Sequence, residues 1–120
     1  MNIFLVFLGG GMGSLLRYAL SCWLNGRSAF PYGTMAANVL GCFLIGLITG
    51  ILLRLGDGAE SGRLLLVVGF CGGFTTFSTF SNEAFAMFQQ ANYLMFFIYI
   101  FLSLSLCMLA VFAGTRLASI

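Results

Sequence analysis

The chain has 120 residues, of which 61% are hydrophobic and 7% are charged, and its net charge is +2. A soluble domain carries about 25% charged residues, so the composition excludes an ordinary soluble protein and indicates a single integral membrane domain over residues 1–120. The small net charge gives no reason to expect nucleic-acid binding, and the absence of histidine removes the commonest metal ligand and general base. We therefore expect no enzyme activity.

Apolar residues are gathered into segments that are long enough to cross a bilayer as helices, which takes about 20 residues each. The connectors between them are short. We predict an all-α membrane protein with four transmembrane helices, over residues 3–23, 32–53, 64–88 and 93–113. The first segment contains Arg17 and is longer than the apolar core of a signal peptide, so we interpret it as a retained span.

The arginines are divided with little preference between the two sides of the predicted membrane domain. Arg54, Arg63 and Arg116 lie on the side that holds both termini. Arg27 lies on the other side, and Arg17 is about two turns inside the membrane from there. Since orientation follows the balance of positive charge in the loops, a weak bias permits insertion in either direction.

Small residues recur at helical spacing in the first two spans. Gly9 and Gly13 form a GxxxG pair, and Gly33, Ala37 and Gly41 repeat the four-residue spacing. Such faces let helix backbones approach closely, so we predict tight helix packing. One copy of four helices leaves little room for a lined pore, so we expect a homo-oligomer if anything crosses.

The four cysteines stand in different apolar segments, at positions 22, 42, 71 and 107, and none forms a CxxC motif. Buried free cysteine behaves as a small hydrophobic residue, so we interpret these as packing residues. A disulfide or a metal site is the weaker interpretation, because the spacing supports neither.

Few polar side chains fall inside the predicted spans. Arg17 either snorkels to the interface or concentrates anions at a pore mouth. Asn38 either joins two helices or offers its amide hydrogens to a passing ion. Glu83 would pair with an arginine that the sequence does not identify. Tyr99 and Ser103 share one helix face. They either form a short hydroxyl track or make ordinary interhelical hydrogen bonds.

The third span contains a run that disfavours regular helix. Glycines stand at positions 69, 72 and 73, and the β-branched pair Thr75 and Thr76 follows. We predict a break over residues 72–75, where unpaired carbonyls would suit a hard cation such as Na⁺. Phe77 and Phe80 then share a face, either as core packing or as ring edges that meet a small anion.

Three stretches taken together resemble one family. They are GGGMGSLLRY at residues 9–18, GTMAANVLG at residues 33–41 and GFCGGFTTFSTFS at residues 69–81. The third is long and unusual in composition. The chain resembles the small bacterial fluoride channels of the Fluc or CrcB family over its full length, most weakly in the fourth span.

The resemblance implies an antiparallel, dual-topology homodimer in the bacterial inner membrane with two passive pathways for fluoride export, each lined by both subunits. It also implies one structural Na⁺ on the twofold axis, held by the backbone carbonyls of Gly72 and Thr75. Cys107 stands where several relatives have a small hydroxyl. The pathway residues implied are Arg17, Thr34, Asn38, Phe77, Thr79, Phe80, Tyr99 and Ser103.

Two other functions are compatible with a four-span chain of this length. A proton-coupled exporter of cationic drugs would need an acid deep in the membrane, normally early in the chain, and the first span has none. A non-transporting scaffold would explain the glycine faces but not the GGFTTFSTF run.

Overall fold

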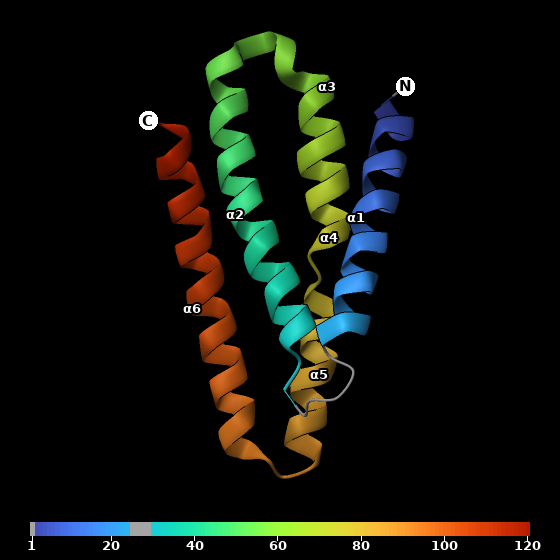
Figure 1. Cartoon of the computed structure of the whole chain (residues 1–120), viewed down its shortest axis with the longest axis vertical. Helices are drawn as coiled ribbons and strands as arrows, with labels where there is room; N and C mark the ends of the chain where they lie inside the picture. Colours follow the sequence, from blue (N-terminus) through green and yellow to red (C-terminus); the bar gives the residue numbers. More distant parts are fainter. Residues whose placement is uncertain (1, 25–29) are drawn as a thin grey trace.

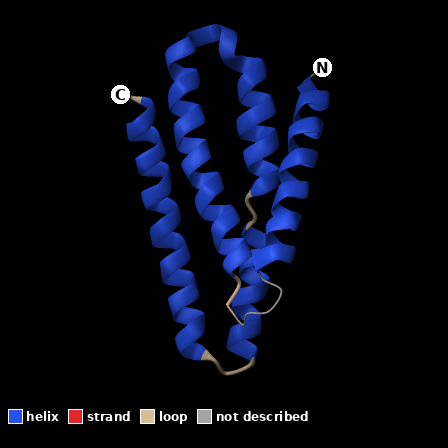
Figure 2. Cartoon of the chain, viewed as in Figure 1, coloured by secondary structure: helices blue, strands red, loops and turns tan. Residues whose placement is uncertain are grey.

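The computed structural model describes residues 2–24 and 30–120, and all regular structure within these ranges is helical, as Figure 2 shows. The connector that carries Arg27 lies outside the described residues. The elements in chain order are α1 (Asn2–Leu24), α2 (Tyr32–Leu55), the 3₁₀ turn η1 (Gly56–Ala59), α3 (Glu60–Gly62), the π-helical η2 (Arg63–Cys71), α4 (Gly72–Phe74), α5 (Phe77–Gln89) and α6 (Tyr93–Ala118).

Long apolar helices make up the molecule. Within the described residues, α1, the stretch 32–89 and α6 are long and apolar enough to cross a membrane. The middle stretch has 58 residues and folds back on itself, so that α2 runs antiparallel to the leg made by α3 through α5 (Figure 1). Both termini lie at the same end of the bundle as this turn (Figure 1). The chain is thus an all-helical, multi-pass membrane protein.

The turn after α2 depends on Gly56. Its φ of +79° and ψ of −149° lie in a region that residues with a Cβ rarely adopt. The Gly56 backbone N–H still donates to the carbonyl of Leu52, which caps the end of α2. The chain can therefore reverse direction within a few residues.

Glycines bring the helices of each pair into backbone contact. A Cβ added at Gly13 of α1 would overlap the carbonyl of Phe70, and one added at Gly73 would overlap the carbonyl of Gly10. The tight packing predicted for the GxxxG face of the first helix is confirmed, and its partner is the leg made by η2 and α4. α2 and α6 pack against each other in the same way at Gly46 and Gly114.

The third leg is broken, but not at the glycines. Gly72 is helical, with φ −62° and ψ −37°, whereas Thr75 and Thr76 are extended. The prediction that the break begins at residue 72 was therefore wrong. The glycines serve close packing, and the β-branched threonine pair leaves the helical conformation. The new helix α5 begins after Thr76, whose side chain accepts a hydrogen bond from the backbone N–H of Thr79.

Most large apolar side chains point outward, as a surface that meets lipid or a partner requires. The buried cluster is small and lies between α2, α5 and α6. It consists of Met35, Phe80, Ala84, Met87 and Tyr99. Phe80 of this cluster also lines the candidate site.

Candidate functional site

A pocket of about 230 Å³ lies beside the break in the third leg. It is formed by α2, the extended residues of the break, the first turn of α5 and the middle of α6. Four of the predicted pathway residues meet in it, namely Asn38, Phe77, Phe80 and Ser103, together with Thr75 of the predicted Na⁺ site. The full lining is Asn38, Cys42, Thr75, Thr76, Phe77, Phe80, Ser103, Leu104 and Cys107.

Asn38 hydrogen-bonds the backbone at the helix break. Its side-chain Oδ1 accepts a hydrogen bond of 2.7 Å from the backbone N–H of Thr76, and its Nδ2 donates one of 3.0 Å to the Thr76 carbonyl. The amide thus replaces the partners that Thr76 lost when it left the helix. Of the two alternatives for Asn38, helix joining is what the structure shows. One of its two amide hydrogens is used in this pair.

The two phenylalanines have different surroundings. Their ring centroids are 5.8 Å apart and the rings are tilted by 43°. Phe80 is only 8% exposed and packs on Tyr99, at a centroid distance of 5.0 Å. Phe77 is 75% exposed. Phe80 therefore belongs to the buried wall of the pocket, whereas most of the Phe77 ring is left uncovered by the described residues.

Ser103 contributes an unsatisfied hydroxyl. The residue is 4% exposed, and its Oγ has no hydrogen-bond partner among the described residues. Buried polar groups are nearly always paired, because an unpaired one costs free energy. Since Ser103 lines the pocket, a ligand there would be the natural acceptor or donor for this hydroxyl.

Two further predicted residues do not line the pocket and instead donate hydrogen bonds to Glu83. Thr34 donates from its hydroxyl to one carboxylate oxygen of Glu83 at 3.1 Å, and Tyr99 donates to the other at 3.0 Å. Thr34 and Tyr99 are fully buried, at 1% and 0% exposure. The sequence did not predict that Thr34, Glu83 and Tyr99 lie together. Glu83 lies one turn after Phe80, and Tyr99 packs on Phe80. Helical spacing alone would therefore have placed Glu83 on the same face as Phe80.

Thr79 and Arg17 support the break and do not line the pocket. Thr79 donates its backbone N–H to the side chain of Thr76 at 3.2 Å, as the first turn of α5 requires. Arg17 donates from Nε to the carbonyl of Gly73 at 3.1 Å, at the carboxyl end of α4. A cation is favoured there, because the last carbonyls of a helix carry partial negative charge.

The break also determines which carbonyls could hold a cation. In a continuous helix the carbonyl of Gly72 would accept from the N–H of Thr76, but this N–H donates to Asn38 instead. The Cys71 carbonyl, by contrast, accepts from both the N–H and the hydroxyl of Thr75. Among the described residues no group of three or more His, Cys, Asp or Glu could hold a metal ion. The break therefore frees the Gly72 carbonyl from the donor that a continuous helix would give it.

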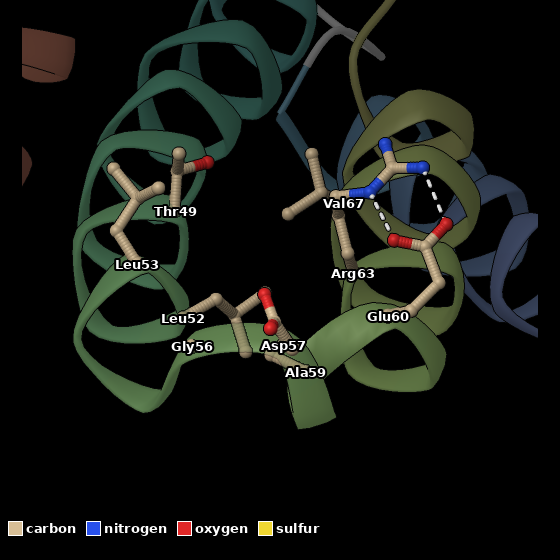
Figure 3. Close-up of a pocket in the computed structure, with 9 residues that line it drawn as sticks. All are labelled: Thr49, Leu52, Leu53, Gly56, Asp57, Ala59, Glu60, Arg63 and Val67. Carbon is tan, nitrogen blue, oxygen red and sulfur yellow. Dashed lines mark hydrogen bonds and ion pairs between the residues drawn. The ribbon is translucent and has the colours of Figure 1, made fainter.

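A larger pocket, of about 430 Å³, lies at the turn between α2 and η2 (Figure 3). None of the predicted site residues lines it. Its main polar feature is an exposed ion pair of 2.8 Å between Arg63 and Glu60, and this arginine lowers the pKa of the Glu60 carboxyl. Exposed pairs of this kind contribute little to stability, so we assign this pocket no role in the candidate site.

The comparisons with known proteins show which family the chain belongs to. A family model described as "CrcB-like protein, Camphor Resistance (CrcB)" matches residues 4–115. The chain belongs to the CrcB-like family. The resemblance carried by the three stretches is thereby confirmed, and the matched range contains every residue of the pocket.

Several curated relatives of this family carry the name "Fluoride-specific ion channel FluC". The one from Phocaeicola vulgatus is 47% identical over 115 residues, which cover 94% of each chain. The one from Rhizobium johnstonii is 49% identical and covers 92% of this chain and 90% of its own. The one from Flavobacterium psychrophilum is 42% identical over 98% of this chain and 96% of its own. The similarity thus spans whole proteins.

Proposed function

We propose that this chain is a fluoride-specific ion channel, through which F⁻ leaves the cytoplasm passively along its gradient. The name of its full-length relatives supports this function. The observation that carries it within the chain is the pocket at the break, where Asn38, Phe77, Phe80 and Ser103 converge. It combines aromatic rings with a few hydrogen-bond donors.

These groups suit a small, hard anion. Water that leaves F⁻ must be replaced, since an unpaired charge is costly away from water. The rings of Phe77 and Phe80 have positive edges, which attract an anion. The Ser103 hydroxyl, which has no partner among the described residues, adds a strong donor. Thr34, Tyr99 and Thr79 complete the track as residues that position Glu83 and the break.

A second copy of the chain would complete the pathway. Phe77 is largely exposed and the pocket opens at the surface of a single chain, so a partner is needed to enclose the ion. We propose an antiparallel, dual-topology homodimer with two pathways. The near balance of Arg54, Arg63 and Arg116 against Arg17 and Arg27 supports insertion in both orientations. In each subunit α1, α2, the leg from η2 to α5, and α6 would cross the membrane, near residues 3–23, 32–53, 64–88 and 93–113.

The break would hold one structural Na⁺ at the centre of this dimer. The carbonyls of Gly72 and Thr75 from each subunit would bind it, as hard oxygen ligands. Loss of the helical donor to Gly72 supports this assignment, because that carbonyl is left for another partner. Bound there, Na⁺ would supply positive charge between the two broken helices.

Flux from liposomes tests the function directly. Purified chain is reconstituted with internal fluoride or chloride, and a K⁺ ionophore allows the charge to balance. We expect rapid release of fluoride and none of chloride. Release of both anions, or of neither, would contradict a fluoride-specific channel.

Two substitutions test the site. Phe80→Ile removes a ring and Asn38→Asp removes an amide donor, so we expect each to lower fluoride flux by at least about tenfold, the effect of roughly 1.4 kcal/mol, while the dimer persists. Phe4→Ile is the matched control, because Phe4 is 58% exposed near the start of α1. Wild-type flux in both site variants would show that the pocket is not the pathway.

A further inference from the structure

Two thiols from different helices face the pocket. Cys42 of α2 and Cys107 of α6 both line it. Both cysteines are free and half-buried. The interpretation of all four cysteines as packing residues is therefore insufficient for this pair.

The neighbouring helix contact holds the two thiols together. Gly46 lies one turn after Cys42, and a Cβ added there would overlap the carbonyl of Val111, which lies one turn after Cys107. At this point α2 and α6 touch through backbone atoms. The two thiols are thus fixed next to a rigid helix crossing, where neither helix can move away cheaply.

An independent feature marks this side of the pocket as a place for a ligand. Ser103 is one turn before Cys107 on the same face of α6, and its buried hydroxyl has no partner among the described residues. The helix therefore presents an unsatisfied hydroxyl and a thiol to the same space.

We propose that Cys42 and Cys107 form a two-thiolate site for a soft metal ion that takes two ligands, for which Hg²⁺ is the probe. Binding forms two S–Hg bonds and breaks two S–H bonds, and both protons pass to water, so no oxidant or reductant is needed. The product is neutral, which suits a site within the membrane. Soft ions prefer sulfur, and the thiolate is the binding form.

The ligand set excludes the commoner metal of cysteine sites. Structural Zn²⁺ takes four ligands, usually cysteine and histidine. The described residues provide no group of three or more His, Cys, Asp or Glu, and the chain has no histidine. Selectivity for a two-coordinate ion over Zn²⁺ is therefore part of the proposal.

Occupation of the site should stop ion flow. The metal would lie between the thiols and the space bounded by Phe77, Phe80 and Ser103. This consequence rests on the proposed function, because it assumes that the pocket is the anion pathway. The metal site itself does not.

Metal binding is measured on the purified full-length chain with Cys22→Ala, which removes the cysteine with an exposed side chain. After washing with a monothiol, intact mass should show one Hg²⁺ per chain, because two linked thiols retain it better than one. Cys42→Ala and Cys107→Ala in this background should each lose it, and Zn²⁺ should not be retained. Serine variants repeat the test if an alanine variant aggregates.

Cys71→Ala in the same background is the matched control, because Cys71 is fully buried and does not line the pocket. It should keep one Hg²⁺. Retention of Hg²⁺ without Cys42 or without Cys107, or its loss without Cys71, would overturn the two-thiolate site.

Flux measurements then separate the two proposals. Fluoride release by the Cys22→Ala chain should fall at least tenfold with Hg²⁺ and recover with excess dithiol. If no variant releases fluoride even without Hg²⁺, the proposed function fails, while the mass measurements still decide the site. If the chain releases fluoride with Hg²⁺ bound, the inference that the site blocks the pathway is overturned.

Discussion

Asn38 carries two tasks at the scale of single residues. Its amide replaces both backbone partners of Thr76, and the same side chain lines the pocket. A site that needs a fixed donor gains from this arrangement, because the amide cannot rotate without breaking two hydrogen bonds. The position of the pocket wall and the geometry of the break are therefore set by one side chain.

Asn38→Leu tests whether the hydrogen bonds of the amide matter, rather than the space that the side chain fills. The side chain keeps a similar size, but the N–H and C=O of Thr76 both lose their partners. We expect a loss of about 1–3 kcal/mol for each group left unpaired, together with loss of flux. Thermal unfolding in detergent and fluoride release measure the two effects. Asn82→Leu is the control, since Asn82 is exposed on α5, and equal effects of both variants would contradict this role.

The buried hydroxyls around Glu83 allow a second test at this scale. Tyr99→Phe keeps the ring on Phe80 and removes only the hydroxyl that donates to the carboxylate at 3.0 Å. Hydrogen bonds to charged groups contribute about 1.5–3 kcal/mol, so we expect a loss of that size. Tyr93→Phe should change stability by much less, because Tyr93 is 50% exposed. An unfolding midpoint for Tyr99→Phe that matches Tyr93→Phe would show that the bond is dispensable.

At the scale of helices, glycines and threonines have different roles. The glycines of the first three legs bring backbones together, and the break is made by Thr75 and Thr76 with the help of Asn38. Arg17 joins these features, because it reaches from α1 to the carbonyl of Gly73 at the end of α4. Tight packing and an irregular backbone can therefore coexist within one leg.

Gly114→Val should damage the α2–α6 crossing. A Cβ at this position would overlap the carbonyl of Phe43, which is backbone and cannot move aside. Overpacking of this kind costs about 1–3 kcal/mol or more, so we expect a lower unfolding midpoint and a wider α2–α6 spacing. Gly11→Ala is the opposite case, because nothing lies within 4 Å of its added Cβ. It should be neutral or stabilising by about 0.5–1 kcal/mol.

Much of this architecture follows from the sequence, and the exceptions have physical causes. Apolar length and small-residue spacing predict the helices and their close contacts, because both depend on local patterns. The motif around Phe77 and Phe80 predicts the pocket wall. The exact break was missed because a glycine permits an irregular backbone without requiring one. The link from Asn38 to Thr76 joins residues 38 positions apart, and spacing rules do not reach that far.

The molecule as a whole leaves much apolar surface uncovered in a single chain. Its buried cluster is small, and many large apolar side chains lie on the surface. Lipid can cover most of these, since lipid tails are as apolar as the side chains. Lipid cannot serve at the pocket, where donors need a polar partner or a partner subunit. A self-complementary contact between two copies would meet this need, as in most homodimers.

Phe77→Ala tests whether the exposed side of the pocket belongs to an assembly. Phe77 is 75% exposed, so its removal should barely change the folding of one chain, yet it should abolish most fluoride flux if a partner encloses it in the pathway. Phe101→Ala provides the matched control, because Phe101 is 67% exposed on α6 and does not line the pocket. Flux from liposomes and the dimer fraction in bilayers are measured for both. Equal flux in the two variants would place Phe77 against lipid, and a two-copy pathway would then lose its main support.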